Sequence, residues 1–248
     1  MKQPFLCIIC IAVLTGTFSA DAKKRHHNYD CNKKLTQAVE DYNLKKYSKV
    51  KTTLEDVKIQ CNGSPIMDSV HYYLGISYLK MKMYVESRSE LERVVSDFPD
   101  SPLFYEAKFR AAMTVYLQAQ PANRDQKETG EAVQLFKDIL ESYPTCPVAD
   151  SVSHYLNLAI DKLAEKELNN ARYYVKMSEY ESAVVYYQLF INQYPDSKFV
   201  DEAKMATAEV LLKLERTSEA KELLADLVGT GKNSDVVGKA KDLQKKIQ

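Results

Sequence analysis

Histidine and cysteine are the residues of this chain that could serve a metal, redox or nucleophilic site. The 248 residues include four histidines and five cysteines. His26 and His27 are neighbours, but two adjacent histidines rarely complete the four-ligand shell of a bound zinc ion. Cys7 and Cys10 have the spacing of a redox pair, but they lie in an apolar run near the N-terminus. We interpret that run as a leader and not as a redox site.

Catalytic motifs of defined spacing are missing from the sequence. It contains no H-E-x-x-H, no G-x-S-x-G and no two C-x-x-C motifs at zinc-site spacing. Residues 229–232 (GTGK) faintly resemble a phosphate-binding loop, but Asp226 occupies the first glycine position and Asn233 the serine or threonine position. We therefore expect no catalytic residue, cofactor, metal or small-molecule substrate, and no enzyme activity.

Three cysteines follow the leader: Cys31, Cys61 and Cys146. Cys31 begins one predicted helix and Cys61 ends the next, so the two meet if these helices form an antiparallel hairpin. A disulfide is then possible if the Cα atoms come within about 7 Å; the alternative is two half-buried thiols. Cys146 stands where two related turns have serine, which favours a positional role.

Composition and charge narrow the class of protein. The 34 Lys and Arg residues balance 34 Asp and Glu residues, whereas nucleic-acid-binding proteins usually carry a basic surface. Only 7 Gly and 8 Pro residues are present, which disfavours turn-rich all-β folds and Pro/Gly-rich disorder. We expect a helical protein that does not bind nucleic acid.

The N-terminus has the features of an export signal. Lys2 precedes a short apolar run, and Ala20 and Ala22 have the small-x-small pattern of a cleavage site. We predict a signal peptide over residues 1–22 and a disordered segment over residues 23–30; the alternative is an uncleaved anchor. No cysteine follows the apolar run where lipoproteins carry one, so the mature chain is expected to be exported and soluble.

The rest of the chain repeats one pattern. Each copy begins with a small residue on a predicted first helix. Three residues spaced i, i+4 and i+7, which lie on one face of a helix, follow on the predicted second helix. In four of the five copies the first of these three residues comes twelve positions after the small residue. The small residues are Ala38, Gly75, Ala112, Ala171 and Ala208. The triplets are Val50/Leu54/Val57, Ser87/Leu91/Val94, Ala132/Phe136/Ile139, Ala183/Tyr187/Phe190 and Ala220/Leu224/Leu227. This predicts an all-α, superhelical solenoid of about five tetratricopeptide-like helix–turn–helix repeats.

The third repeat departs from this spacing by eight additional residues. They fall in a polar stretch, Gln118 to Gly130, which we predict to be a loop between two helices; it is either a functional loop or a tolerated surface insertion. From Val148 to Met177 no helix breaker occurs, which predicts one long helix. We assign residues 31–234 to the repeat domain and residues 235–248 to a C-terminal capping helix.

A more specific pattern lies in the middle of the chain. It comprises Asn123-Arg124-Asp125-Gln126, Glu131-Ala132-x-x-x-Phe136 and Tyr143-Pro144. It continues with Leu163-Ala164-x-x-Glu167-x-x-x-Ala171-x-Tyr173-Tyr174, Tyr180-x-x-Ala183 and Tyr194-Pro195-Asp196-Ser197. The insertion, the long uninterrupted helix and the Tyr-Pro turn follow one another in the order found in the BamD family of the outer-membrane β-barrel assembly machinery, which this sequence resembles. The resemblance covers about residues 31–228.

The resemblance implies a non-enzymatic periplasmic scaffold, peripheral to the outer membrane, that helps assemble and insert β-barrel proteins. Its implied partners are the barrel-forming subunit, docked on the C-terminal repeats, and unfolded barrel precursors, met by the N-terminal repeats. The candidate partner-binding residues are Asn123, Arg124 and Asp125 in the polar stretch of the third repeat, and Tyr186 in the fourth repeat. Tyr186 stands where the family often has an arginine, so a charge pair with the barrel subunit does not carry over.

The family is usually lipid-anchored, and this sequence lacks the cysteine for that anchor. We therefore expect membrane association through partners; the alternative is attachment through a retained leader. The alternative function is that of a periplasmic repeat adaptor for cell-wall or cell-division proteins.

Overall fold

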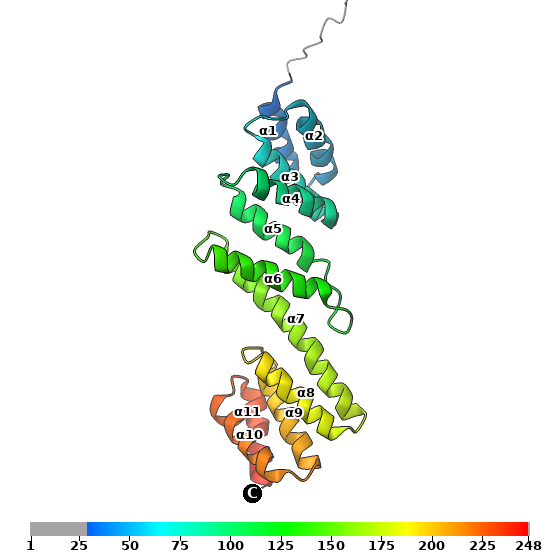
Figure 1. The fold of residues 1–248 in the computed structure, drawn as a ribbon, viewed down its shortest axis with the longest axis vertical. Coiled ribbons are helices and arrows are strands. Elements are labelled where there is room, and N and C mark those ends of the chain that lie inside the picture. Colours follow the sequence, from blue (N-terminus) through cyan, green and yellow to red (C-terminus); the bar gives the residue numbers. More distant parts are fainter. Residues whose placement is uncertain (1–28, 248) are drawn as a thin grey trace, which may run out of the picture. The chain divides into compact units, whose positions relative to one another are not determined.

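The computed structural model describes residues 29–247, and all regular structure in that span is α-helical (Figure 1). The predicted signal peptide, residues 1–22, and nearly all of the predicted segment 23–30 lie outside the described residues. The helices are α1 (Cys31–Asn43), α2 (Tyr47–Gln60), α3 (Met67–Lys80), α4 (Tyr84–Asp97), α5 (Phe104–Tyr116), α6 (Lys127–Ser142), α7 (Ala149–Lys176), α8 (Tyr180–Gln193), α9 (Val200–Lys213), α10 (Thr217–Thr230) and α11 (Ser234–Lys246).

The helices stack in chain order, each packing mainly on the helix before it and the helix after it. First helices of neighbouring repeats also touch, as α1 does α3 and α3 does α5. A fold in which every contact is made with near neighbours is the signature of a repeat solenoid. The predicted all-α repeat architecture is confirmed.

The small residues and the triplets form the core of each repeat. The four first-helix alanines are at most 2 % exposed, and Gly75 is buried with them. The triplet residues are buried too, and Ser87 uses its hydroxyl to donate to the Gly75 carbonyl at 2.8 Å. A small residue at this place lets the second helix approach the first closely enough for the triplet to fill the space between them.

The turn inside a repeat has one conformation, used four times. Lys45, Lys82, Ser178 and Glu215 each adopt a positive φ of 59–61°. At each turn the N–H of the next residue donates to a carbonyl five residues earlier, as Lys46 does to Asp41 at 2.9 Å. These bonds define a Schellman motif, which usually places glycine at the positive-φ position. The third repeat lacks this turn because its insertion lies there.

The third repeat begins its second helix earlier than the sequence predicted. The expected loop over Gln118 to Gly130 is wrong at its end: α6 begins at Lys127, so Gly130 lies within its first turn. Glycine in an exposed helical position costs only about 1 kcal/mol, and the side-chain hydrogen bond between Thr129 and Gln126 supports this turn. The predicted long helix is confirmed as α7, which spans 28 residues.

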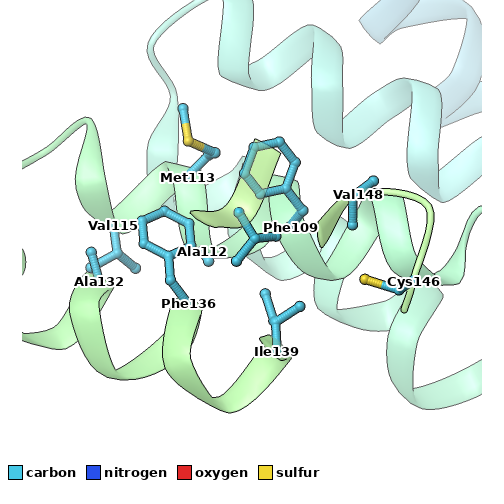
Figure 2. Close-up of a cluster of buried hydrophobic side chains, with 10 residues drawn as sticks. Phe109, Ala112, Met113, Val115, Ala132, Phe136, Ile139, Cys146 and Val148 are labelled. Atoms are coloured by element: carbon cyan, nitrogen blue, oxygen red, sulfur yellow. The ribbon is translucent and has the colours of Figure 1, made fainter. Parts of the chain in front are cut away.

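The core of the third repeat joins α5, α6 and the start of α7. Figure 2 shows Phe109 and Phe136 beside each other, with Cys146 and Val148 from the turn before α7 closing the cluster. Cys146 is 9 % exposed and is a free thiol. Its side chain thus contributes to packing at the turn.

A disulfide connects the two ends of the first repeat. Cys31, the first residue of α1, is bonded to Cys61, which follows α2, and their Cα atoms are 6.1 Å apart. Closing a loop of 30 residues removes entropy from the unfolded chain and stabilises the fold by about 3–4 kcal/mol in the chain-entropy model.

A buried charge cluster connects the first repeat to the second. Glu90 on α4 contacts Lys58 of α2 and His71 Nδ1 of α3, each at 2.6 Å. Burial raises the pKa of Glu90, but the hydrogen bonds from His71 and Lys58 outweigh it, and the pKa lies below its ordinary value. The ionised form of Glu90 is therefore favoured in the folded chain.

Replacing Gly75 with alanine is expected to destabilise the second repeat by about 1–3 kcal/mol. The new Cβ would lie 2.7 Å from Leu91 Cγ and 3.3 Å from the Leu91 backbone nitrogen, so α3 and α4 must move apart. The matched control is Gly130→Ala, whose Cβ meets nothing within 4 Å and should be neutral or stabilising. Urea unfolding midpoints measure both variants, and equal shifts would contradict the packing argument.

Acid should weaken the contact between the first two repeats. Because the folded pKa of Glu90 lies below its unfolded value of about 4.5, its contribution is complete above that pH and is lost as the pH falls through the folded pKa. Glu90→Gln should therefore lower the free energy of unfolding by roughly 1–3 kcal/mol at pH 7 and flatten its dependence on acid. Urea unfolding between pH 7 and pH 3 tests this, with the exposed Glu86→Gln as control; identical profiles for the two variants would be the contrary result.

Candidate functional site

The candidate functional residues of the described chain are exposed side chains suited to contact with a partner. Within residues 29–247, no three His, Cys, Asp or Glu side chains come together to hold a metal. No helix in that part of the chain is long and apolar enough to cross a membrane. The candidate site therefore consists of the predicted partner-binding residues, which fall in two places.

The first place is the loop between α5 and α6. Asn123, Arg124 and Asp125 are all exposed there. Beneath them Gln126 is only 6 % exposed. The loop thus displays three polar side chains above one buried amide.

Gln126 holds the loop in shape. Its amide Nε2 donates to the carbonyl of Pro121 at 2.7 Å and lies within hydrogen-bond distance of three further loop carbonyls, those of Gln120, Arg124 and Asp125. Its oxygen accepts from the Thr129 hydroxyl at 2.7 Å. An amide N–H₂ has only two protons, so these acceptors share them. The exposed side chains are therefore carried on an ordered backbone.

A lysine of the next helix forms a hydrogen bond to the backbone near the start of the loop. Lys162 on α7 donates from Nζ to the carbonyl of Ala119 at 3.0 Å. Burial lowers the pKa of Lys162, which is the shift expected of an ammonium group that has lost water. Sequence reasoning missed Lys162 because nothing in the sequence around it indicates a loop carbonyl 43 residues away.

The second place is α8, where the predicted binding residue Tyr186 packs against a neighbouring helix. Tyr186 is only partly exposed, because its ring stacks on Tyr174 of α7 with centroids 4.5 Å apart and an angle of 18°. The two hydroxyls are 3.3 Å apart. Much of Tyr186 thus serves the contact between α7 and α8.

Two aliphatic residues are exposed on α8 near Tyr186, among polar neighbours such as Gln188 and Asn192. Val185 and Leu189 are both 56 % exposed, four residues apart on the helix surface opposite the buried triplet. Sequence reasoning missed them because it followed the aromatic residues; the available signal was an aliphatic i, i+4 pair outside the repeat pattern. The loop and this face of α8 belong to different repeats.

The order of the loop depends on Gln126, so Gln126→Ala should loosen it without unfolding the repeat. The substitution leaves the loop carbonyls without their common donor, at about 1 kcal/mol per lost bond. Hydrogen exchange of the backbone amides of residues 119, 120 and 122–125 should accelerate by about tenfold. Gln134→Ala on the exposed face of α6, where Gln134 bonds only Asp138, is the control. Unchanged exchange in the Gln126 variant would contradict the assigned role.

The chain matches known proteins over most of its length. The model of the YfiO family, described as outer membrane lipoprotein, matches residues 28–225. A relative named outer membrane protein assembly factor BamD, from Caulobacter vibrioides, is 25 % identical over 64 % of this chain. The match covers 50 % of that relative, so this chain spans about half its length. BamD of Rickettsia prowazekii is 24 % identical over 71 % of this chain and 70 % of its own length.

Solved structures of helical-repeat proteins match most of this chain, but at low sequence identity. A thermophilic tetratricopeptide-repeat protein of Thermus thermophilus is 19 % identical, with 86 % of this chain and 98 % of that one covered and a TM-score of 0.38. MamA of Desulfovibrio magneticus is 11 % identical, with 86 % and 97 % covered and a TM-score of 0.40. The family model spans the insertion, the fused helix and the aromatic turns described above. This chain belongs to the YfiO family of outer membrane lipoproteins, the family of the BamD assembly factors.

Proposed function

We propose that this protein is a non-enzymatic scaffold that works at the periplasmic side of the outer membrane in the assembly and insertion of β-barrel proteins. The observation that carries the proposal is the family match over residues 28–225. The relatives' name, outer membrane protein assembly factor, supports a role in outer membrane protein assembly. The finer proposal is that the repeats bind the barrel-forming subunit and barrel precursors.

The α5–α6 loop is suited to a partner that needs polar contacts. Asn123, Arg124 and Asp125 supply an amide, a guanidinium and a carboxylate on a backbone held by Gln126. An ordered loop loses less conformational entropy on binding than a flexible one. We propose that these three residues contact a partner protein.

The face of α8 is suited to a partner with an apolar surface. Val185 and Leu189 expose aliphatic area next to Tyr186, and removing such area from water contributes about 25 cal/mol per Å². The described residues at this face are a tyrosine and two aliphatic side chains. We therefore propose that the C-terminal repeats dock here through aliphatic and aromatic contact and not through an ion pair.

The proposed partners also account for where the protein is located. We propose that the mature protein lies in the periplasm, peripheral to the outer membrane, and is held there by the barrel-forming subunit.

An affinity isolation from mildly solubilised envelopes of the native host tests the proposal. The tagged full-length chain should enrich a barrel protein that carries periplasmic repeat domains, identified by mass spectrometry. Val185→Glu with Leu189→Glu should reduce its recovery severalfold, because two carboxylates would be buried against an apolar surface. The matched control is Ile59→Glu on α2, where the side chain is 74 % exposed.

The proteins recovered in this isolation distinguish the assembly function from the adaptor function. Enrichment of cell-wall or cell-division enzymes in place of a barrel protein would overturn the assembly function and favour the adaptor function. A barrel protein recovered equally by the α8 variant and the native chain would keep the function but remove α8 from the interface.

A further inference from the structure

The turn between α2 and α3 carries a pair of neighbouring residues that can react with each other. Asn62 is followed by Gly63, and this is the single Asn-Gly pair in the sequence. Both residues are exposed. Gly63 adopts a φ of +80°, a backbone conformation that glycine tolerates and other residues rarely adopt. The shape of the turn therefore places glycine directly after an exposed asparagine.

The backbone nitrogen that follows an asparagine can attack the side-chain amide of that asparagine. At this turn the Gly63 nitrogen gives up its proton and bonds to Cγ of Asn62. The Cγ–Nδ2 bond breaks, and the leaving NH₂ group takes a proton and departs as ammonia, which leaves a five-membered succinimide ring. Water then opens the ring at one of its two carbonyls. The product is either aspartate or isoaspartate, whose main chain passes through Cβ and is one atom longer.

The Asn62 side chain and the Gly63 N–H are both available for this reaction. Within residues 29–247, neither group makes a hydrogen bond. A Cβ added to Gly63 would meet no atom within 4 Å, so the surroundings of the attacking nitrogen are open. The backbone bond that closes the turn runs from the Ser64 N–H to the Cys61 carbonyl at 2.9 Å and involves neither reacting group.

Two other asparagines lie outside helices in the described part of the chain, and both are restrained. After Asn123, the N–H of Arg124 donates to the Pro121 carbonyl at 2.9 Å, so the nitrogen that would attack is held in a bond. The side-chain oxygen of Asn233 accepts from two backbone N–H groups in the first turn of α11, at 3.1 and 3.3 Å. Asn62 has neither restraint.

We propose that Asn62 is a site of spontaneous deamidation, at which the Gly63 nitrogen closes a succinimide ring that opens to aspartate and isoaspartate. The reaction consumes one water and releases one ammonia. The turn between the first two repeats has no part in the proposed assembly function, so either proposal can fail without the other.

Isoaspartate at this position would disturb the junction between the first two repeats. Cys61 cannot follow an added backbone atom, because the disulfide to Cys31 and an N–H bond to the Val57 carbonyl at 2.8 Å hold it. The displacement therefore falls on the other side of the turn, where the N–H of the buried Met67 donates to the Ser64 carbonyl at 3.2 Å. We expect this bond and the bond that closes the turn to be lost.

Timed mass spectrometry of the full chain tests the proposal. The purified protein is kept in warm, mildly alkaline buffer and digested, and its peptides are fragmented by electron transfer, which distinguishes isoaspartate from aspartate. Asn62 should react about tenfold faster than Asn123 and Asn233, a difference in barrier of about 1.4 kcal/mol, and should give both products. Asn62→Gln should stay unmodified over the same time, because glutamine would have to close a larger ring.

Hydrogen exchange of the aged protein measures the effect on the junction. The amides of Ser64 and Met67 should exchange about tenfold faster in the isoaspartate form than in the equally aged Asn62→Gln chain. Freshly prepared Asn62→Asp is the matched control, since it adds the charge without lengthening the main chain, and it should leave the exchange of both amides unchanged.

An Asn62 that stays intact while Asn123 or Asn233 reacts would overturn the proposal, and so would aspartate as the one product at Asn62. Asn62, Gly63 and Ser64 also fit the N-x-S/T pattern of a glycosylation site, and a sugar on Asn62 of the chain purified from its native host would overturn it as well. Equal exchange in the isoaspartate and glutamine forms would overturn the assigned effect on the junction.

Discussion

The close approach of two helices at one small residue is the constraint on which the structure depends. At Gly75 the space beside the backbone is already filled by Leu91, and the Ser87 hydroxyl bonds the Gly75 carbonyl. The same relation recurs with alanine in the other four repeats, where the alanine is buried and the second helix presents a buried triplet. Each repeat alone leaves one apolar face open, so the stacking of neighbours follows from this packing.

The third repeat shows what happens when the relation between the helices is kept but the connection is lengthened. Ala112 and Ala132 are both buried, so the packing survives eight additional residues. The Schellman turn is lost, and carbonyl groups of the lengthened loop find donors in the side chains of Gln126 and Lys162. A buried polar group without a partner is costly, and the insertion is therefore tolerated in an ordered form. Its exposed side chains become available for binding because Gln126 and Lys162 carry the internal bonds.

The sequence was sufficient for features that follow from local periodicity or from proline. It was insufficient where the usual residue is missing from a turn or where separate helices meet. Helix spacing, the long α7 and the breaks at the aromatic-proline turns could be predicted, because each rests on local periodicity or on proline. The Schellman turns escaped prediction because lysine, serine and glutamate stand where glycine is usual. The loop bond from Lys162 and the stacking that half-buries Tyr186 escaped it because both join separate helices. The start of α6 was placed too late because the polar stretch was assigned to the loop as far as Gly130, whereas the helix begins at Lys127.

The two ends of the stack must replace the neighbour that interior repeats have, and they do so differently. The first repeat has a disulfide across its open end and the Lys58–Glu90 contact toward the second repeat. The last repeat has α11, whose Ala240 is fully buried against α9 and α10. Asp201 fixes the turn into α11 by accepting the backbone N–H groups of Lys232 and Asn233, both at 2.6 Å. Covalent closure at one end and a packed helix at the other complete the stack, and the insertion and the exposed side chains of α8 lie in the repeats between them.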